Sequence, residues 1–493
     1  MVLLASCSSV GPDYERPQFY SAPEIKKSLD LKPEQARPIA KDWYKSFNDP
    51  VLNRLIAEAG ADNPNVKATI HKLRQARQNL KINAVNNLPK LSADGSYHYM
   101  KDNQSYGMAL STDYYQAGLD ASWEIDIWGG GRRLTEQTLA LYQGAASALD
   151  NVRLSLTAEV ANNYIALRVA DEQLRIAKRN LKIQENIYDL VKQKYDVGLA
   201  DDISLNQARY IVETTRETIP QLEYQIEAYR NSLAILSGKL PGQLEEMLQI
   251  KENNLVRRRF NYDLAKLYQL PADVLRDRPD VQISEQNLIA KNAAVGQAVA
   301  QMLPNVSLSA FFGFQSRNLG RLFSSATDTY NYSPSLTLPI FQWGQLVNNV
   351  KLQKEIKKEY FYLYQQSLLN AANEVKNAMV SVEKEYHKNQ SSREAVLSQQ
   401  EVASLTLSKY KEGLIDFNDV LTSQQNLLES QNTLIASNGA IYQNIISFYK
   451  SVGGGYRTHY DYKAPCSGCE VNRRQKEAAQ KSDTVAAVHN DAD

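Results

Sequence analysis

The sequence predicts an α+β membrane protein in which four strands per chain adjoin a long helical body. Three observations lead to this prediction: alternation of apolar and polar residues in several segments, two very long helical segments without internal proline, and an internal repeat. The chain has 493 residues, more than one ordinary core needs, so several structural regions are expected.

Alternation is clearest between residues 115 and 127. Leu119 and Trp123 stand on one face of a strand with this period, and Asp120 and Glu124 stand on the other. A water-soluble sheet could show this pattern, and so could a barrel strand of about 9–11 residues between lipid and a wet lumen. Strands are predicted at about 90–101, 114–127, 305–316 and 330–341.

The overall composition excludes several classes of protein. The formal net charge is +1, so no basic surface indicates nucleic-acid binding. Charged residues make up 23% of the chain and no run of 18 apolar residues occurs, so no transmembrane helix is expected. Any span of a membrane must therefore be a closed barrel, because only helices and closed barrels satisfy their backbone groups in lipid.

Two long segments have the period of helices. Residues 132–197 contain no proline, and residues 344–411 contain neither proline nor glycine after the first position. A helix of about 65 residues spans roughly 100 Å, which no compact domain needs. The first segment carries two apolar stripes, which indicates packing between two neighbours rather than a single coiled-coil seam. Glycines at Gly198 and Gly413 predict turns that return the chain.

The chain repeats itself with a period of 215 residues. Landmarks that recur at this offset are Pro64 and Pro279, Leu88-Pro89 and Leu303-Pro304, Trp128 and Trp343, Tyr195 and Tyr410, Gly198 and Gly413, and Gly238 and Gly453. Chance does not produce this agreement without drift, so the second half is expected to repeat the fold of the first.

Four strands form a ribbon with two exposed edges, and an open edge cannot lie in lipid. Copies must therefore associate until the sheet closes. Two copies would give eight strands and a filled barrel, whereas three would give twelve and leave room for a pore. Phe311 and Phe341 interrupt the polar face and are expected to lie outside the wet lumen.

The N-terminal residues predict a lipid anchor. Leu4-Ala5-Ser6-Cys7 follows a short apolar run and is similar to a bacterial lipobox, in which the cysteine is acylated. No basic region precedes it, so the translation start is expected further upstream or the leader is truncated. The alternative is an ordinary buried cysteine. A proline-rich segment follows, as a tether would require.

No enzyme chemistry is predicted. No catalytic residues, cofactor or metal site emerges, because no nucleophile stands beside a base and the five histidines share no ligand spacing. Cys466 and Cys469 form a single CxxC that could be a disulfide or a metal clip. A local disulfide is the simpler interpretation in an oxidising compartment.

Three motifs resemble one family. Arg278-Pro279-Asp280, Leu303-Pro304-Asn305 and Leu338-Pro339-Ile340-Phe341 are similar to those of outer-membrane efflux channels of the TolC type, and the lipidated branch serving resistance-nodulation-division pumps fits best. The resemblance implies a homotrimeric channel-tunnel with a 12-stranded barrel in outer-membrane lipid and a periplasmic barrel of helices. It also implies two partners, a periplasmic adaptor protein and an inner-membrane pump, and export of drugs, toxic compounds or metal ions.

The resemblance places the functional site at the helical turns. The tips implied to close the periplasmic end and meet the adaptor comprise Tyr195, Gly198, Asp201, Asp202, Tyr410, Gly413, Asp416, Asp419 and Thr422. Thr422 stands where relatives often carry a pore-constricting aspartate, so Asp416 and Asp419 are candidates to replace it. The alternatives are helix capping for Asp416 and Asp419, with Asp201 or Asp202 capping the other hairpin, and ordinary packing for the tyrosines.

We divide the chain into six parts. They are a signal remnant (1–7), an extended arm (8–40), a first repeat (41–240), a linker (241–273), a second repeat (274–456) and a disordered tail (457–493). Two alternatives to the efflux channel remain open. One is an outer-membrane channel for ABC-driven protein secretion, and the other is an envelope coiled coil without a channel, which leaves the alternating strands unexplained.

Overall fold

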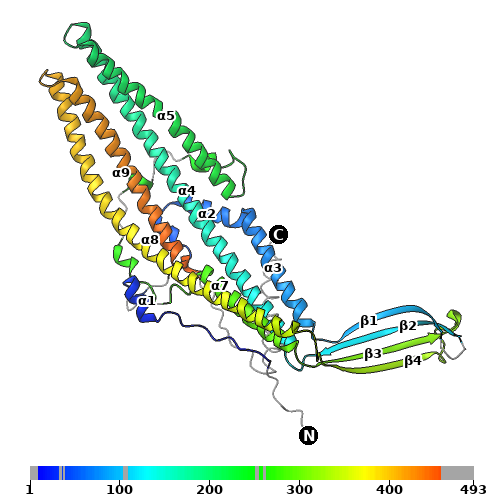
Figure 1. The fold of residues 1–493 in the computed structure, drawn as a ribbon. Coiled ribbons are helices and arrows are strands. Elements are labelled where there is room, and N and C mark those ends of the chain that lie inside the picture. Colours follow the sequence, from blue (N-terminus) through cyan, green and yellow to red (C-terminus); the bar gives the residue numbers. More distant parts are fainter. Residues whose placement is uncertain are drawn as a thin grey trace.

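A four-stranded sheet lies at one end of the molecule and a long body of helices at the other (Figure 1). The computed structural model describes residues 9–32, 36, 39–103, 109–249, 255–258, 263–271 and 273–456. Cys7, Cys466 and Cys469, for which the sequence predicts a lipid anchor and a disulfide, lie outside the described residues, as does the tail after residue 456.

The sheet is an antiparallel meander. Its strands lie in the order β1-β2-β3-β4, so β1 and β4 are the two edges. The strand expected at 330–341 is shorter at its end, because the chain leaves the sheet at Pro339 and turns into a helix. The strands are β1 (Lys90–Asn103), β2 (Ala109–Ile125), β3 (Asn305–Ser316) and β4 (Asp328–Thr337).

The register gathers the apolar side chains on one face of the sheet. Leu119 pairs with Phe312, and Phe312 pairs with Tyr330 on the next strand. These side chains are 46–73% exposed in the single chain, as are several other apolar residues of this face. A wide apolar surface without a cover is expected for strands that face lipid.

Phe311 does not leave the polar face, contrary to the sequence-based expectation. It pairs with Asp120, and its ring lies over Gly118 and Gly313, which pair with one another. A Cβ atom added at Gly118 would lie 2.6 Å from Phe311 Cζ. The two glycines therefore leave the space that this aromatic ring occupies on the polar face. Phe341 lies beyond the end of β4 and is exposed.

The helices repeat with the same offset as the sequence. Three helices of the first repeat each have a partner of equal length that begins 215 residues later, which confirms the internal two-fold repeat. Among the described residues, no helix is both long and apolar enough to cross a membrane. The pairs are α3 (Pro64–Val85) with α7 (Pro279–Ala300), α4 (Gly130–Asp196) with α8 (Gln345–Lys411), and α5 (Asp202–Leu236) with α9 (Phe417–Ser451).

Two shorter helices meet end to end beside each long one. In the first repeat, the cap residue of α3, Asn63, donates from Nδ2 to the Leu236 carbonyl at the end of α5, at 2.8 Å. In the second repeat, Arg278 stands before α7 and donates from Nη1 to the Ser451 carbonyl at the end of α9, also at 2.8 Å. In the repeat, Asn63 is equivalent to Arg278 and Leu236 is equivalent to Ser451. Both joints therefore have the same structure, made with different side chains.

Gly238 shows why the joint is tight. It has a positive φ of 70°, and a Cβ atom there would lie 2.6 Å from the Asp62 carbonyl oxygen. Gly453, its equivalent, has a φ of 81° and lies against Arg278. Only glycine combines this backbone conformation with so close an approach of a second helix.

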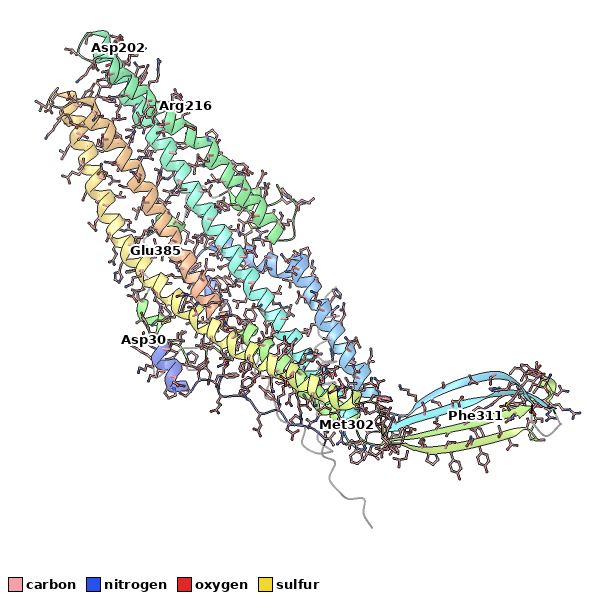
Figure 2. All side chains as sticks on the ribbon, in the orientation of Figure 1. Asp30, Asp202, Arg216, Met302, Phe311 and Glu385 are labelled. Atoms are coloured by element: carbon pink, nitrogen blue, oxygen red, sulfur yellow. The ribbon has the colours of Figure 1, made fainter. Side chains whose placement is uncertain are left out.

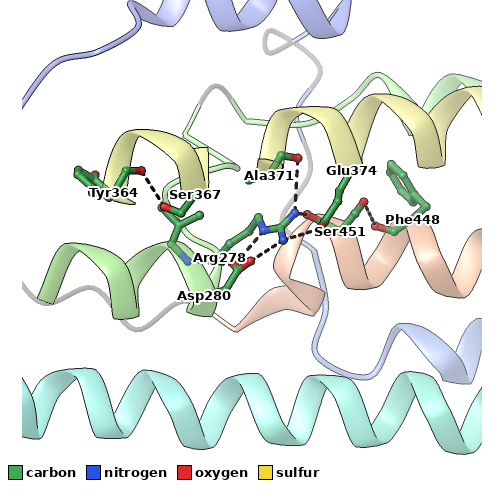
Figure 3. A network of polar contacts seen from close by, with 9 residues as sticks. Arg278, Asp280, Tyr364, Ser367, Ala371, Glu374, Phe448 and Ser451 are labelled. Atoms are coloured by element: carbon green, nitrogen blue, oxygen red, sulfur yellow. Dashed lines mark hydrogen bonds and ion pairs between the residues drawn. The ribbon is translucent and has the colours of Figure 1, made fainter. Parts of the chain in front are cut away.

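Arg278 is the centre of the second joint (Figure 3). Its side chain is buried, and it reaches α8 through the Ala371 carbonyl and the Glu374 carboxylate, at 3.5 and 2.6 Å. It also pairs with Asp280 at 2.6 Å on its own helix. One guanidinium thus connects α7, α8 and α9, and its fork of donors suits several acceptors at once.

The main hydrophobic core surrounds these joints. It includes Leu52, Leu55, Tyr164 and Ile445, all fully buried. The helix expected to begin near residue 42 is divided: a 3₁₀ turn, η2 (Trp43–Phe47), precedes α2 (Pro50–Asp62). The division arises at Asn48, whose φ of 52° ends the turn, before the Asp49 carboxylate caps α2 through the amides of residues 51 and 52.

The arm of residues 8–40 is not extended throughout. It contains helix α1 (Ala22–Leu29), which Ser21 and Glu24 stabilise by a reciprocal capping box that the proline content concealed. The linker likewise contains short turns in its described parts, α6 (Glu245–Leu248), η3 (Leu255–Arg257) and η4 (Leu264–Leu267).

Arg133, in the first turn of α4, holds the start of the arm. Its buried guanidinium donates to the carbonyls of Ser9, Val10 and Gly11 at 3.1–3.3 Å and to the Asp13 carboxylate at 2.7 Å. These contacts fix the arm at the boundary between sheet and helices.

Replacing Arg278 should weaken the second joint. Arg278→Ala leaves the Ser451 carbonyl without this donor and removes the ion pairs to Asp280 and Glu374, so we expect the free energy of unfolding to fall by about 2–3 kcal/mol. The measurement is loss of helical circular dichroism on heating the purified protein in detergent. Arg276→Ala is the control, because the ion pair of Arg276 with Asp273 is long, at 3.9 Å, and does not connect two helices. Equal melting temperatures for the two variants would contradict this role of Arg278.

Candidate functional site

The two helical hairpins end in tips at the far end of the molecule from the sheet. Asp202 marks one tip and Phe311 the opposite end of the chain's long axis (Figure 2). Both tips turn through a glycine with positive φ, 74° at Gly198 and 76° at Gly413. The amide of the residue after each glycine donates a hydrogen bond to the last turn of the preceding helix. The Leu199 amide donates to the Lys194 carbonyl at 2.7 Å, and the Leu414 amide donates to the Lys409 carbonyl at 2.9 Å.

The first tip is held by its own side chains. The Tyr195 hydroxyl donates to the Asp202 carboxylate at 2.9 Å, and the Ser204 amide donates to the Asp201 carboxylate at 2.8 Å. Asp201 is therefore the cap of α5, whereas Asp202 binds the tyrosine. The bond to Asp202 raises the pKa of Tyr195, and the bonds from Ser204 lower the pKa of Asp201.

The second tip uses the same backbone with different contacts. Asp416 occupies the cap position of α9 but makes no capping hydrogen bond with its side chain. Tyr410 is buried, and its ring packs on Phe417 with the centroids 5.5 Å apart. Asp419 follows in the first turn of α9, and Thr422 lies one turn further; both are exposed.

Lys194 connects the two hairpins. Its ammonium group donates to the Tyr410 carbonyl at 2.6 Å and lies 4.3 Å from the centre of the Tyr410 ring. It also approaches the Lys411 carbonyl at 3.4 Å. A cation at these last carbonyls of α8 is favoured by the helix dipole, so this contact fastens α4 to the end of α8.

A small apolar cluster lies beneath the tips. It contains side chains from α4, α5, α8 and α9, so all four helices share one packed unit there. Its buried members are Ile187, Val191, Ala208, Tyr410, Phe417 and Val420. Beyond this cluster the tips are open, with Leu199 76% and Leu414 67% exposed. Large apolar side chains at the end of a long helical body are suited to contact another protein.

Both tyrosines are among the residues predicted from the sequence, but Lys194 is not. A signal was present, because a lysine precedes the tyrosine in both repeats, at Lys194 and Lys409. Packing, the alternative that the sequence left open for both tyrosines, occurs at Tyr410, whereas the Tyr195 hydroxyl is hydrogen-bonded to Asp202. Within the described residues, no three His, Cys, Asp or Glu side chains are placed to hold a metal ion.

A sheet with an exposed apolar face, joined to helices of 67 residues that end in exposed tips, defines a membrane channel with a long extension. The sequence profile described as "Outer membrane efflux protein" matches residues 55–239 and 270–454, two stretches that begin 215 residues apart. The chain belongs to this family. It is an outer-membrane channel with a periplasmic body, and the predicted trimeric channel-tunnel fold is confirmed.

Several relatives cover nearly the whole chain. The chain is 29% identical over 462 residues to "Probable efflux pump outer membrane protein TtgC" of Pseudomonas putida, covering 92% of this chain and 94% of the relative. It is 27% identical to the "Cation efflux system protein CusC" of Escherichia coli, with 92% and 97% covered. It is also 27% identical to the "Probable outer membrane lipoprotein SilC" of Salmonella typhimurium, with the same coverage.

Solved structures agree with these relatives. The outer-membrane channel OprN superposes with a TM-score of 0.83 at 28% identity, covering 91% of this chain and 99% of that channel. The Campylobacter jejuni channel CmeC superposes with a TM-score of 0.82 at 25% identity, covering 92% and 96%. These comparisons support efflux from the periplasm rather than the ABC-driven secretion channel or the coiled coil considered from the sequence.

The equivalent residues Asp201 and Asp416 should respond differently to substitution. Asp201→Ala removes the cap of α5, so we expect faster hydrogen–deuterium exchange at the Ser204 amide. Asp416→Ala is the matched control and should leave the start of α9 unchanged, because its carboxylate caps nothing. Equal acceleration at both helices would show that the Asp201 bond is not what holds the first turn.

The same cap predicts a dependence on pH. Because the folded-state pKa of Asp201 is lowered, its stabilising effect is complete above the ordinary aspartate value of about 3.9 and is lost as the pH falls through the lowered value. The α5 tip should therefore stay ordered at neutral pH and fray only in acid. Amide temperature coefficients of residues 202–205, measured across this range, check the direction.

Proposed function

We propose that the chain forms the exit duct of a tripartite pump whose tips close the channel at rest and meet a periplasmic adaptor. An inner-membrane pump of the resistance-nodulation-division type would supply the energy. The observation that carries the proposal is the pair of tips themselves, each with an exposed leucine, Leu199 or Leu414, about 100 Å along the helices from the sheet.

The cargo would be drugs, toxic organic compounds or metal ions. Relatives carry names that refer to toluene, antibiotics and cations, and this range suits a duct without a dedicated binding pocket. In the first repeat the polar face of the sheet presents Asp94, Gln116 and Asp120, which favour a hydrated path. The duct itself would carry out no covalent chemistry.

Cys7 is proposed as a lipid anchor. Arg133 holds residues 9–13 at the boundary between sheet and helices, and an anchor at Cys7, two positions before Ser9 in the sequence, would need only a short reach to the membrane surface. An acyl chain there would add to the hold of the strands in the outer membrane. The name of the relative SilC, an outer-membrane lipoprotein, accords with this proposal.

The gate is proposed at the tips, where side-chain contacts hold the hairpins together. Lys194 fastens the two hairpins within one chain. The carboxylates of Asp416 and Asp419 make no hydrogen bond or ion pair among the described residues of their own chain, which leaves them free to contact a neighbouring copy. Opening would separate these contacts between copies while each apolar cluster remains intact.

In-cell crosslinking tests the adaptor contact. A photoreactive label on Leu199→Cys or Leu414→Cys should capture a periplasmic adaptor and, with it, a proton-driven pump, identified by mass spectrometry. Leu240→Cys is the matched control, since Leu240 is 70% exposed but lies at the opposite end of α5. Capture of an ABC transporter would move the proposal to protein secretion. Equal capture from all three positions would remove the tips as the docking site.

Conductance tests the gate. Asp416→Ala combined with Asp419→Ala should raise the ion conductance of the closed channel in a planar bilayer, because contacts between copies are lost. Glu429→Ala, an exposed carboxylate on α9 away from the tip, should leave conductance unchanged. If the double variant conducts no better than the unsubstituted channel, the gate does not depend on these aspartates.

A further inference from the structure

The helices next to the sheet lie in the same order as the strands. α3 borders α4, α4 borders α7, and α7 borders α8, which matches β1-β2-β3-β4. The outer edges of this layer are therefore α3 with β1 on one side and β4 with α8 on the other (Figure 1).

Both outer edges carry exposed apolar side chains where the sheet meets the helices. On the turn between β4 and α8, Ile340 and Trp343 are each 89% exposed, and Phe341, 71% exposed, contacts Trp343 with ring centroids 4.9 Å apart. Leu88, on the turn between α3 and β1, and Leu91, at the start of β1, are 58% and 69% exposed. The single chain leaves both surfaces without a cover.

The middle of the chain shows how such edges fit. There the β2–α4 turn meets the α7–β3 turn: Trp128 Nε1 donates to the Pro304 carbonyl at 2.6 Å, and Ile125 pairs with Val306. Trp128 is half-buried by this contact. This is the contact between the first repeat and the second repeat of one chain.

The 215-residue offset maps this contact onto the outer edges. Trp128 and Ile125 become Trp343 and Ile340, whereas Pro304 and Val306 become Pro89 and Leu91. β1 and β4 run in opposite directions, so when copies close the sheet the end of β4 lies beside the start of β1 of the next copy. The mapped residues then meet across the boundary between copies.

We propose that the β4–α8 turn of one copy docks on the α3–β1 turn of the next in the register of the internal β2–β3 pair. We call this contact the junction seam. In it, Ile340 pairs with Leu91 of the next copy, and the Trp343 indole donates to the Pro89 carbonyl. This inference rests on the proposed exit duct being a trimer of this chain, and it adds the register and the anchoring side chain.

A second copy fits this surface better than lipid does, because Trp128, the repeat equivalent of Trp343 at the internal turn, already has a protein partner. A tryptophan that fills a defined position with an available carbonyl is typical of an interface anchor.

Disulfide trapping tests the register. Ile340→Cys with Leu91→Cys should yield covalent trimers on mild oxidation, because directly opposed Cβ atoms lie about 4.5–5.5 Å apart. Ile340→Cys with Ala93→Cys, two residues out of register, is the matched control and should crosslink roughly tenfold less. Native mass spectrometry of the unoxidised protein gives the number of copies independently.

The outcomes separate two failures. Trimers by mass that crosslink at the control pair, or at neither pair, would overturn the seam and leave the channel function standing. A monomer by mass would overturn the trimer on which both depend. Crosslinking at Ile340 and Leu91 alone supports the proposed register.

Single substitutions and a spin label test the anchor. Trp343→Ser should reduce the share of trimer that survives detergent by roughly tenfold, and Trp343→Phe should reduce it less, because the ring is kept and only the donor is lost. Leu319→Ser, at an equally apolar but remote loop, should have no effect. A nitroxide on Phe341→Cys should be shielded from both oxygen and a water-soluble nickel chelate. Free access of oxygen would show that lipid covers the turn instead.

Discussion

The end-to-end joint between short helices is the constraint on which the rest of the structure depends. A tube with uniform walls needs each continuous helix to be matched along most of its length, and here helices of 22 and 35 residues in line match one of 67. The joint must satisfy the last carbonyls of one helix and the first turn of the next. Asn63 does this with one amide, and Arg278 does it with a guanidinium that also reaches α8.

Much of the fold could be predicted from the sequence because two signals are strong and local. Period-two alternation located the strands, and the repeat gave the lengths of the helices twice over. The predictions that were wrong concern features that depend on contacts between particular side chains. Phe311 remained on the polar face because Gly118 and Gly313 leave room for its ring, and no local pattern reveals that two glycines will pair. Helix α1 depends on a cap at Ser21 within proline-rich surroundings.

The site was predictable only as a location. Glycines and aspartates marked both turns, but equivalent residues make different contacts. Asp201 caps its helix and Asp416 does not; Tyr195 binds a carboxylate at the surface and Tyr410 is packed in the cluster. Side-chain partners at a tip depend on which neighbouring helix lies within reach, and spacing along one chain does not determine this. The two hairpins are thus alike in backbone and unlike in how firmly they are fastened.

The joints also determine how far a tilt of one helix would move its tip. A rod of 35 residues, such as α5 or α9, is about 50 Å long and is attached to the rest of its column through a few side chains at one end. A tilt of about 5° at that pivot displaces the far end by about 4 Å, close to the spacing of two paired strands. Because α9 also packs along α8, such a tilt near Arg278 would carry the α8–α9 hairpin with it as one unit.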